Sequence, residues 1–328
     1  TWFRAHPIPG DILFVNKGTP GRVCLVPDPV DFCIAQDMIA LRADESKIYP
    51  KYLFTVLRSR EIQQQIYNTN VGDVIPHFKK QFLDQLLIPI PERSIQESIG
   101  DLYYVLSLKA ERNKKINDNL QQQASALFSS FYDWSNTEVR YTDLIQILGG
   151  GTPKTGENTY WNGNIAFFTP KDVGTPYTFI TEKTITEEGL SHCNSRLYPV
   201  NTVFVTARGT VGKVGLSGVP MAMNQSCYAL VGKETHQLLV YFYTLKAVDR
   251  LKHKASGAVF DAITTRDFDS EQIMKLSDDD AKAFLCVAEP MFQEILNNSI
   301  ENLRLSTLRD FLLPKLMSGE IDVSSVQL

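Results

Sequence analysis

The sequence repeats itself, in the same order and with nearly the same spacing, at an offset near 190 residues. A strand-like run at 9–15 returns at 199–205, and a basic turn at 17–23 returns at 208–214. Both turns read basic-Gly-Thr-x-Gly-basic-Val. Chance matches do not stay collinear over such a span, so we expect two copies of one structural module.

Each copy is expected to be rich in β-strands and to end in one helix. Short Val, Ile, Phe and Tyr runs alternate with Gly, Pro, Asn and Thr, which is typical of strands and turns. The helices are expected over 52–67 and 238–254. Far fewer residues precede Pro9 than precede Pro199 within its own copy. We therefore expect that the first copy lacks its opening segment and that the chain, which begins with Thr1, is a fragment or a trimmed product.

A long helix is expected after each globular part. The first is predicted from Ser94, because its apolar residues keep a seven-residue frame, the period of a coiled-coil seam. The second is predicted from Ser277, a residue type that caps helix starts, followed by three aspartates on the positive helix end. Pro290 is expected to kink this helix or to delay its start. In the first helix the frame holds Ile95, Ile99, Leu102, Leu106, Ile116, Leu120 and Leu127.

The expected fold class is α+β: two β-rich domains related by the internal repeat and separated by two long helices that pair as an antiparallel coiled coil. Asn113 and Asn298 are expected to meet near the middle of the pair, where a buried asparagine fixes the register. The expected boundaries are 1–90 for the first domain, 91–134 for the first long helix, 135–275 for the second domain, 276–318 for the second long helix and 319–328 for a tail.

Composition restricts the class of protein. The 328 residues carry a net charge of −4, so any nucleic-acid contact must use a local basic surface. The five cysteines are scattered and none is spaced C-x-x-C, which argues against a disulfide framework and against a zinc site and favours a reducing cytoplasm. No run of apolar residues is long enough to span a membrane.

The two basic turns allow two interpretations. G-x-x-G is a weak motif, and glycine is also what a tight hairpin turn requires. Recurrence of the flanking basic residues in both copies favours contact with nucleic acid. The candidate residues of the two turns are Lys17, Thr19, Arg22, Arg208, Thr210 and Lys213.

The glycine-rich stretch 149–156 resembles a phosphate-binding loop. A Walker-type loop needs Lys-Ser/Thr after its last glycine, and here Gly156 is followed by Glu157, so nucleotide hydrolysis is not expected. Two interpretations stay open: a flexible turn, or a loop whose amides, together with Thr152 and Lys154, contact DNA phosphate.

Aromatic and basic residues also cluster near this loop. Tyr160 and Trp161, with Lys171 nearby, could stack on or reach bases, although aromatics in β-rich segments are more often core. A basic run at 246–254 is by default interpreted as a solvent-exposed helix face, and contact with DNA phosphate is the more specific alternative. Lys79 and Lys80 occupy a comparable place in the first copy.

Catalytic signatures are missing from the sequence. It contains no H-E-x-x-H, no G-x-S-x-G and no G-x-G-x-x-G opening a helix after a strand, so neither a metal site nor a dinucleotide site is expected. It also lacks the Asn/Asp-Pro-Pro-aromatic string of amino-methyltransferases. The chain is interpreted as a recognition component without catalytic residues.

This arrangement resembles the specificity subunit of type I restriction-modification systems. The supporting stretches are 199–212 in the second domain, 88–96 before the first long helix and 311–321 near the C-terminus. Two departures are a second long helix without a proline-rich entry and the missing start of the first domain.

The resemblance implies that each globular domain reads one half of a split DNA target. The helices would space the halves and dock two methyltransferase subunits that carry S-adenosylmethionine. Restriction subunits using ATP and magnesium would join the larger complex, and this chain would hold no cofactor. Base reading would fall to residues such as Gln36, Gln225, Arg208 and Lys154. Alternatives are a coiled-coil scaffold with peptide-binding domains and, less favoured, a fused endonuclease or methylase.

Overall fold

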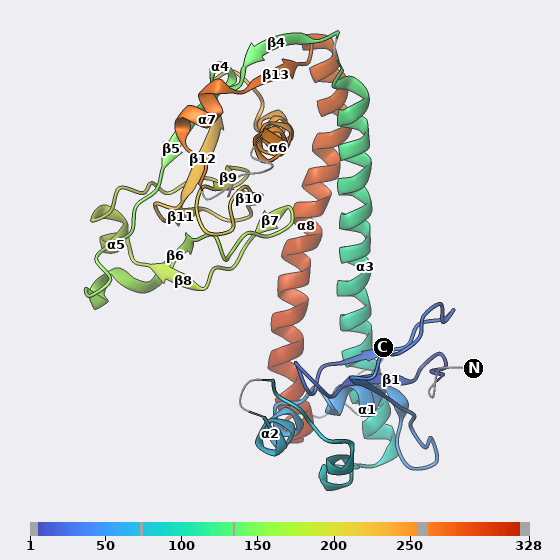
Figure 1. The fold of residues 1–328 in the computed structure, drawn as a ribbon. Helices are drawn as coiled ribbons and strands as arrows, with labels where there is room; N and C mark the ends of the chain where they lie inside the picture. Colours follow the sequence, from blue (N-terminus) through green and yellow to red (C-terminus); the bar gives the residue numbers. More distant parts are fainter. Residues whose placement is uncertain (1–5, 73–74, 134, 255–261, 322–328) are drawn as a thin grey trace. The chain divides into compact units, whose positions relative to one another are not determined.

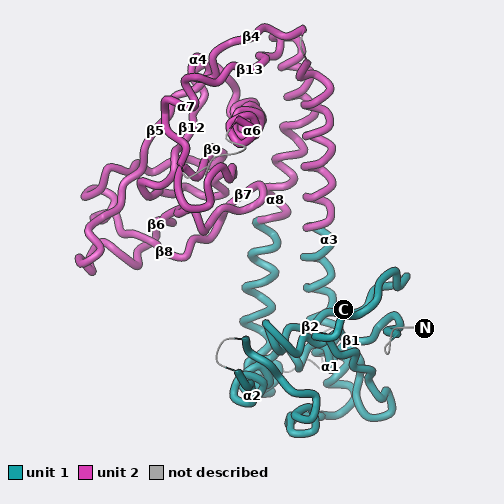
Figure 2. Tube along the Cα trace, viewed as in Figure 1, with its two compact units in different colours: residues 1–113, 300–328 teal, residues 114–299 magenta. Residues whose placement is uncertain are grey.

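The computed structural model of the chain describes residues 6–72, 75–133, 135–254 and 262–321, so residues 322–328 of the expected tail lie outside the described part. The chain divides into two compact units (Figure 2). Unit 1 comprises Thr1–Asn113 and Ile300–Leu328, and unit 2 comprises Lys114–Ser299. Each unit combines short strands with helices, which confirms the α+β class.

Unit 1 contains one antiparallel sheet in the order β2-β1-β3. Its helical part differs from the expectation of one helix over 52–67, because the chain forms two helices there. The hydroxyl of Ser59 accepts a hydrogen bond from the backbone N–H of Ile62 and starts the second helix. The elements are β1 (Ile12–Val15), β2 (Val23–Leu25), β3 (Met38–Leu41), α1 (Pro50–Val56), α2 (Arg60–Thr69) and η1 (Lys80–Gln85).

Unit 2 contains a five-stranded sheet in the order β5-β12-β9-β10-β7, a three-stranded sheet β11-β6-β8 and the pair β13-β4 (Figure 1). The helix expected over 238–254 is confirmed as α6. The elements are β4 (Thr137–Arg140), α4 (Tyr141–Leu144), β5 (Ile145–Gly149), η2 (Asn158–Tyr160), β6 (Trp161–Phe168), β7 (Tyr177–Thr178), β8 (Lys183–Ile185), α5 (Glu187–Ser191), β9 (Val203–Thr206), β10 (Val214–Ser217), β11 (Met221–Met223), β12 (Cys227–Gly232), α6 (Gln237–Lys254), α7 (Thr265–Ser270) and β13 (Gln272–Lys275).

The sequence repeat is a repeat of strand order and register. Strand β1 lies between β2 and β3 in unit 1, as β9 lies between β10 and β12 in unit 2, and all four pairings are antiparallel. Ile12 lies opposite Leu25, and their counterparts Val203 and Leu216 lie opposite each other. Because a one-residue slip would turn every side chain to the other face, equal registers place matching residues of the two copies on matching faces of their sheets.

Two long helices are present, α3 (Arg93–Phe131) and α8 (Asp278–Met317), close to the expected starts. The hydroxyl of Ser277 accepts a hydrogen bond from the backbone N–H of Asp280, as expected of an N-cap. Pro290 lies inside α8, so the expectation of a delayed start is wrong. The first turns are held instead by the cap and by Phe284, which packs edge-on against Phe128 of α3 at 5.4 Å.

The two helices pair antiparallel in each unit. In unit 2, Asn117 bonds Asn298, while Phe128 further along α3 meets Phe284, earlier on α8. In unit 1, Nδ2 of Asn113 donates to Asn302 and Glu301, and the guanidinium of Arg309 lies over the ring of Tyr103, earlier on α3. Positions thus rise on one helix as they fall on the other.

The expected pairing of Asn113 with Asn298 is replaced by two separate polar contacts. Asn298 bonds Asn117, one turn beyond Asn113, and Asn113 bonds Asn302, one turn beyond Asn298. A seven-residue pattern defines which face of a helix is buried, but two registers that differ by one turn both satisfy it. The side-chain contacts decide between them.

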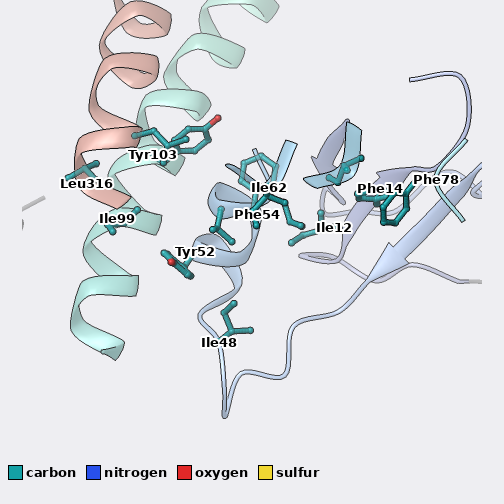
Figure 3. Close-up of a cluster of buried hydrophobic side chains, with 14 residues drawn as sticks. Ile12, Phe14, Ile48, Tyr52, Phe54, Ile62, Phe78, Ile99, Tyr103 and Leu316 are labelled. Atoms are coloured by element: carbon teal, nitrogen blue, oxygen red, sulfur yellow. The ribbon is translucent and has the colours of Figure 1, made fainter. Parts of the chain in front are cut away.

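The core of unit 1 joins its sheet, its short helices and both long helices (Figure 3). Ile12 and Phe14 of β1, Tyr52 of α1, Ile99 of α3 and Leu316 of α8 belong to one buried cluster. Each is at most 6% exposed. The ends of the long helices are therefore part of the domain core in this unit.

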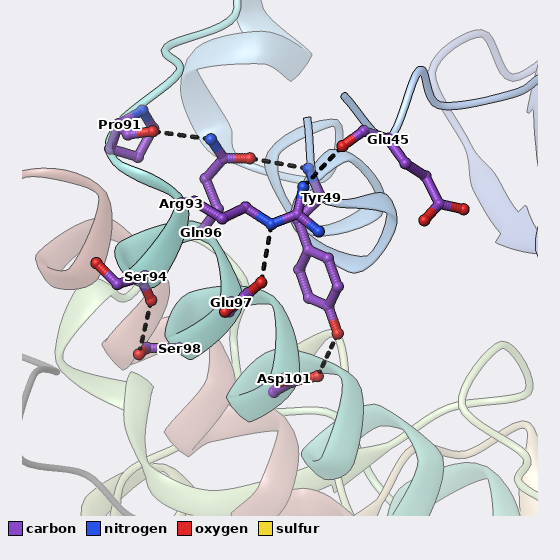
Figure 4. A network of polar contacts seen from close by, with 9 residues as sticks. All are labelled: Glu45, Tyr49, Pro91, Arg93, Ser94, Gln96, Glu97, Ser98 and Asp101. Carbon is purple, nitrogen blue, oxygen red and sulfur yellow. Dashed lines mark hydrogen bonds and ion pairs between the residues drawn. The ribbon is translucent and has the colours of Figure 1, made fainter. Parts of the chain in front are cut away.

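Polar contacts fix the start of α3 against α1 (Figure 4). Gln96, which is 3% exposed, accepts from the backbone N–H of Tyr49 at 2.8 Å and donates to the carbonyl of Pro91. The hydroxyl of Tyr49 donates to Asp101, and Arg93 reaches the carbonyl of Glu45. Buried amides need such partners, so this junction has one preferred geometry. No helix in the described ranges is both long and apolar enough to cross a bilayer.

Candidate nucleic-acid interface

The second basic turn connects β9 to β10. Gly209 and Gly212 have φ values of +82° and +73°, a left-handed conformation that glycine adopts without strain. The N–H of Gly212 donates to the carbonyl of Thr206 at 2.9 Å, which closes the turn. Arg208 and Lys213 are exposed on either side of it.

The first basic turn has the same construction. Gly18 and Gly21 have φ values of +83° and +90°, and the N–H of Gly21 donates to the carbonyl of Val15 at 3.0 Å. Lys17 and Arg22 are exposed. The hairpin-turn interpretation is therefore confirmed, and it leaves the basic side chains free to face a ligand. Contact with nucleic acid stays a prediction.

A glutamine occupies the same place beside each turn. Gln36 and Gln225 are exposed, and the carbonyl of the residue after each accepts a backbone hydrogen bond from the start of the turn, Asp37 from Asn16 at 3.0 Å and Ser226 from Ala207 at 2.8 Å. In unit 2 the carbonyl of Ser226 accepts from the backbone N–H of Arg208 at 3.2 Å, so the Gln225 segment lies directly beside the basic turn. An amide side chain there can donate to and accept from base edges.

The glycine-rich loop is held against this segment. A Cβ at Gly150 would lie 2.2 Å from the carbonyl oxygen of Asn224, and the N–H of Gly151 donates to the carbonyl of Met223. The hydroxyl of Thr152 donates to Oε1 of Gln225. The loop is thus fixed by its neighbours. Thr152, which contacts Gln225, and Lys154 are both exposed.

Trp161 anchors that loop. Its indole N–H donates to the carbonyl of Lys154 at 3.2 Å, and its ring meets Phe167 edge-on. The ammonium of Lys183 lies 5.6 Å from the centre of the indole ring. Tyr160 stacks on His192 with ring centres 4.9 Å apart. Both aromatic residues have protein partners, which supports the structural interpretation, and their contact with DNA stays a prediction.

Two further candidates lie near the second turn. The hydroxyl of Thr210 donates to the carbonyl of Pro170 at 3.1 Å, and Lys171 follows directly. Lys171 pairs with Glu182 at 3.5 Å, with both side chains exposed, so its charge is partly offset. Thr19 occupies the matching place in unit 1 and is also exposed.

In unit 1, Lys79 and Lys80 lie close to the first turn. The N–H of Gly18 donates to the carbonyl of Pro76, and the backbones of Lys17 and His77 form an isolated antiparallel β-bridge. Phe78 is fully buried, and the two exposed lysines follow it at the start of η1. Lys17, Lys79 and Lys80 therefore belong to one part of the surface.

The basic run at the end of α6 is largely engaged within the protein. Arg250 and Lys254 both pair with Glu271, whose carboxylate is fully buried. Lys246 lies over the ring of Tyr132, and His253 lies near Asp249. Glu271 was missed in the sequence, because nothing in its local pattern marks an acid that will be buried beside a helix far from it in the chain.

Two observations concern metal binding and cysteine chemistry. The described ranges hold no cluster of three His, Cys, Asp or Glu residues suited to a metal ion. Burial raises the pKa of the Cys227 thiol to about 12, so this cysteine stays protonated and unreactive at neutral pH.

Known proteins share this sequence pattern. The family model described as the type I restriction modification DNA specificity domain matches residues 4–122 and 133–275. The type I restriction enzyme HindI specificity subunit of Haemophilus influenzae is 24% identical, over 95% of this chain and 86% of that protein. The EcoR124I/EcoR124II specificity subunit of Escherichia coli is 30% identical over 50% of this chain and 45% of its own length.

One solved structure shares the fold. The S subunit of a type I restriction-modification system from M. genitalium superimposes with a TM-score of 0.63. The match covers 95% of this chain and 83% of that one, at 16% sequence identity. At this identity the likeness concerns the fold.

Proposed function

Because the chain belongs to the type I restriction modification DNA specificity domain family, we propose that it is the DNA-reading subunit of a type I restriction-modification complex. The observation that carries the proposal is the pair of basic turns. They have the same backbone conformation, the same closing hydrogen bond and the same flanking charges in both units. Each unit would therefore read one half of a two-part DNA target.

In each unit, the basic residues of the turn would provide affinity for DNA, and the neighbouring glutamine would provide sequence specificity. Lys17 and Arg22 in one unit, and Arg208 and Lys213 in the other, would neutralise phosphates. Gln36 and Gln225 are placed beside these turns, where amides can reach base edges. Because the net charge is −4, the protein as a whole does not attract DNA, and binding must use local basic surfaces such as these turns.

We assign the chemistry to partners. The chain would be non-catalytic and cytoplasmic, and two methyltransferase subunits would carry S-adenosylmethionine. Restriction subunits would use ATP and magnesium. The paired helices would dock the methyltransferases and set the spacing of the half-sites, a task that suits a long antiparallel pair with polar contacts fixing its register.

The test is a titration of random-sequence duplex with the chain assembled with its methyltransferase, followed by fluorescence anisotropy over a range of salt concentrations. We expect an association constant that falls steeply with salt. Binding that is absent or insensitive to salt would contradict the proposal. It would favour the second candidate, a scaffold whose β-rich domains hold peptides.

A further inference from the structure

Lys252 on α6 lies against the second basic turn. A Cβ added at Gly212 would lie 2.5 Å from Cε and 3.3 Å from Nζ of Lys252. The aliphatic part of the lysine therefore crosses the turn at its glycine and carries the ammonium group to the turn's edge. Like Arg208 and Lys213 of that turn, Lys252 is exposed.

The acidic side chains of this part of unit 2 contact residues other than Lys252. Glu271 pairs with Arg250 and Lys254, and Asp249, on the same turn of α6, lies near His253. No ion pair joins Lys252 to any described carboxylate. Clustered cations repel one another and raise the local potential, so this surface favours a polyanion.

The equivalent place in unit 1 holds a neutral residue. A Cβ added at Gly21 would lie 2.8 Å from Oε1 of Gln63 on α2. Nε2 of Gln63 donates to the carbonyls of Gly21 at 2.9 Å and Leu57 at 2.7 Å. Gln63 therefore ties the turn to its helix, and a charge is not needed to fill this position. Packing against the turn therefore does not account for the positive charge of Lys252 at this position in unit 2.

We propose that Lys252 binds a DNA phosphate, so that unit 2 has one more cationic backbone contact than unit 1. The inference rests on the proposed function, since it assigns one more residue to the same surface. A lysine ammonium is a point charge on a flexible stem and suits phosphate contact without base preference. Unit 2 would therefore hold its half-site with the steeper salt dependence.

The experiment compares the wild-type complex with Lys252→Gln and Lys252→Met, both assembled with the methyltransferase and titrated with random duplex at several salt concentrations. Each variant is expected to weaken binding and to lower the slope of log K against log salt by about one. Lys252→Met keeps an aliphatic stem against Gly212, so an equal effect in both variants separates charge from packing. Lys246→Gln, six residues earlier on α6 and over the ring of Tyr132, is the matched control and should leave the slope unchanged.

A reciprocal variant tests the comparison between the units. Gln63→Lys places a cation at the equivalent position, and we expect the slope to rise by about one if the variant keeps the wild-type unfolding midpoint. Wild-type slopes in both Lys252 variants, with salt-dependent binding by the wild type, would overturn the inference and leave the proposed function intact. A changed sequence preference with an unchanged slope would also overturn it. Absence of salt-dependent binding in the wild type would overturn both.

Discussion

Nδ2 of Asn298 donates a hydrogen bond to Oδ1 of Asn117 across helices α8 and α3 of unit 2, with 3.0 Å between nitrogen and oxygen. The two side chains are 7% and 8% exposed. Asn117 in turn donates to Oγ of Ser299 at 3.2 Å. Sliding the helices by one turn would leave buried amides without partners, so these contacts select one register.

Removing one member of this pair should destabilise the chain. We expect Asn298→Ala to lower the free energy of unfolding by about 1–3 kcal/mol, because Oδ1 of Asn117 stays buried without its donor. Urea denaturation measures the change. Asn297→Ala, on the exposed side of the same helix, should stay within about 0.5 kcal/mol of the wild type. Equal values for the two variants would mean that the contact does not hold the register.

The glycine-rich loop should not tolerate a side chain at Gly150. Its added Cβ would lie 2.2 Å and 2.5 Å from the carbonyl oxygens of Asn224 and Met223, and backbone cannot rotate aside as a side chain does. We expect Gly150→Ala to cost about 1–3 kcal/mol of stability, as overpacking does, and to weaken DNA binding. Gly156→Ala meets open space on the same loop and is the control. A neutral Gly150→Ala would show that the loop is free to move.

Thr152 should affect which sequence is bound. Its hydroxyl donates to Oε1 of Gln225 and so orients the amide. We expect Gln225→Ala to lose about 1–3 kcal/mol of discrimination at one position of one half-site. Thr152→Val should reduce discrimination at the same position, with the salt slope unchanged in both. Selection from a randomised duplex library measures this, with Thr155→Val, exposed on the same loop, as the control. Loss at two unrelated positions would contradict the contact.

The basic turns should affect binding to every sequence. We expect Arg208→Ala with Lys213→Ala to lower the salt slope by about two, and Lys17→Ala with Arg22→Ala to do the same. The matched control is Lys233→Ala with Lys282→Ala, which removes two exposed charges of unit 2 elsewhere. Unchanged slopes, with all protein partners retained, would favour the scaffold alternative.

Low pH should reduce the stability of unit 1, because Asp11 loses its charge. Nε and a terminal nitrogen of Arg42 donate to its two oxygens at 2.8 Å and 2.9 Å, and these hydrogen bonds hold the pKa of Asp11 below its ordinary value. The ionised form is thus favoured in the folded state. Its stabilisation is complete above the unfolded pKa of about 3.9 and is lost as the pH falls through the lower folded value.

The measurement is the free energy of unfolding at pH 7 and pH 3 for the wild type and Asp11→Asn. We expect the wild type to be the more stable at pH 7, and the difference to shrink at pH 3. Asp31→Asn, an exposed carboxylate change in the same unit, should differ little from the wild type at either pH. A difference for Asp11→Asn that grows with acid would have the wrong sign for this ion pair.

The sequence predicted the features that depend on the spacing of apolar residues and on the order of the repeated segments. The repeat predicted two modules, and equal registers at Ile12 and Val203 confirm it. The seven-residue frame predicted the first long helix, and the cap residue Ser277 with the aspartates after it predicted the start of the second. Neither predicted the register of the two helices, because that depends on which amides meet. The break at Ser59 was also missed, because a serine inside an apolar-periodic run reads equally as interior or as cap.

The candidate surface was predicted less completely. The basic turns were visible because their charges recur. The run at the end of α6 was ambiguous, because only the fold brings Glu271 to Arg250 and Lys254 and leaves Lys252 beside Gly212. Contacts between residues distant in the chain decide which charged side chains are free to face solvent and which form ion pairs within the protein.

The most direct test of two DNA-reading units is single-molecule methylation mapping of host DNA with the gene, without it, and with the Gln225→Ala variant. We expect a two-part adenine-methylated motif that requires the gene, and a change confined to one part in the variant. Methylation that is unaffected by loss of the gene, or a single undivided motif, would contradict the account.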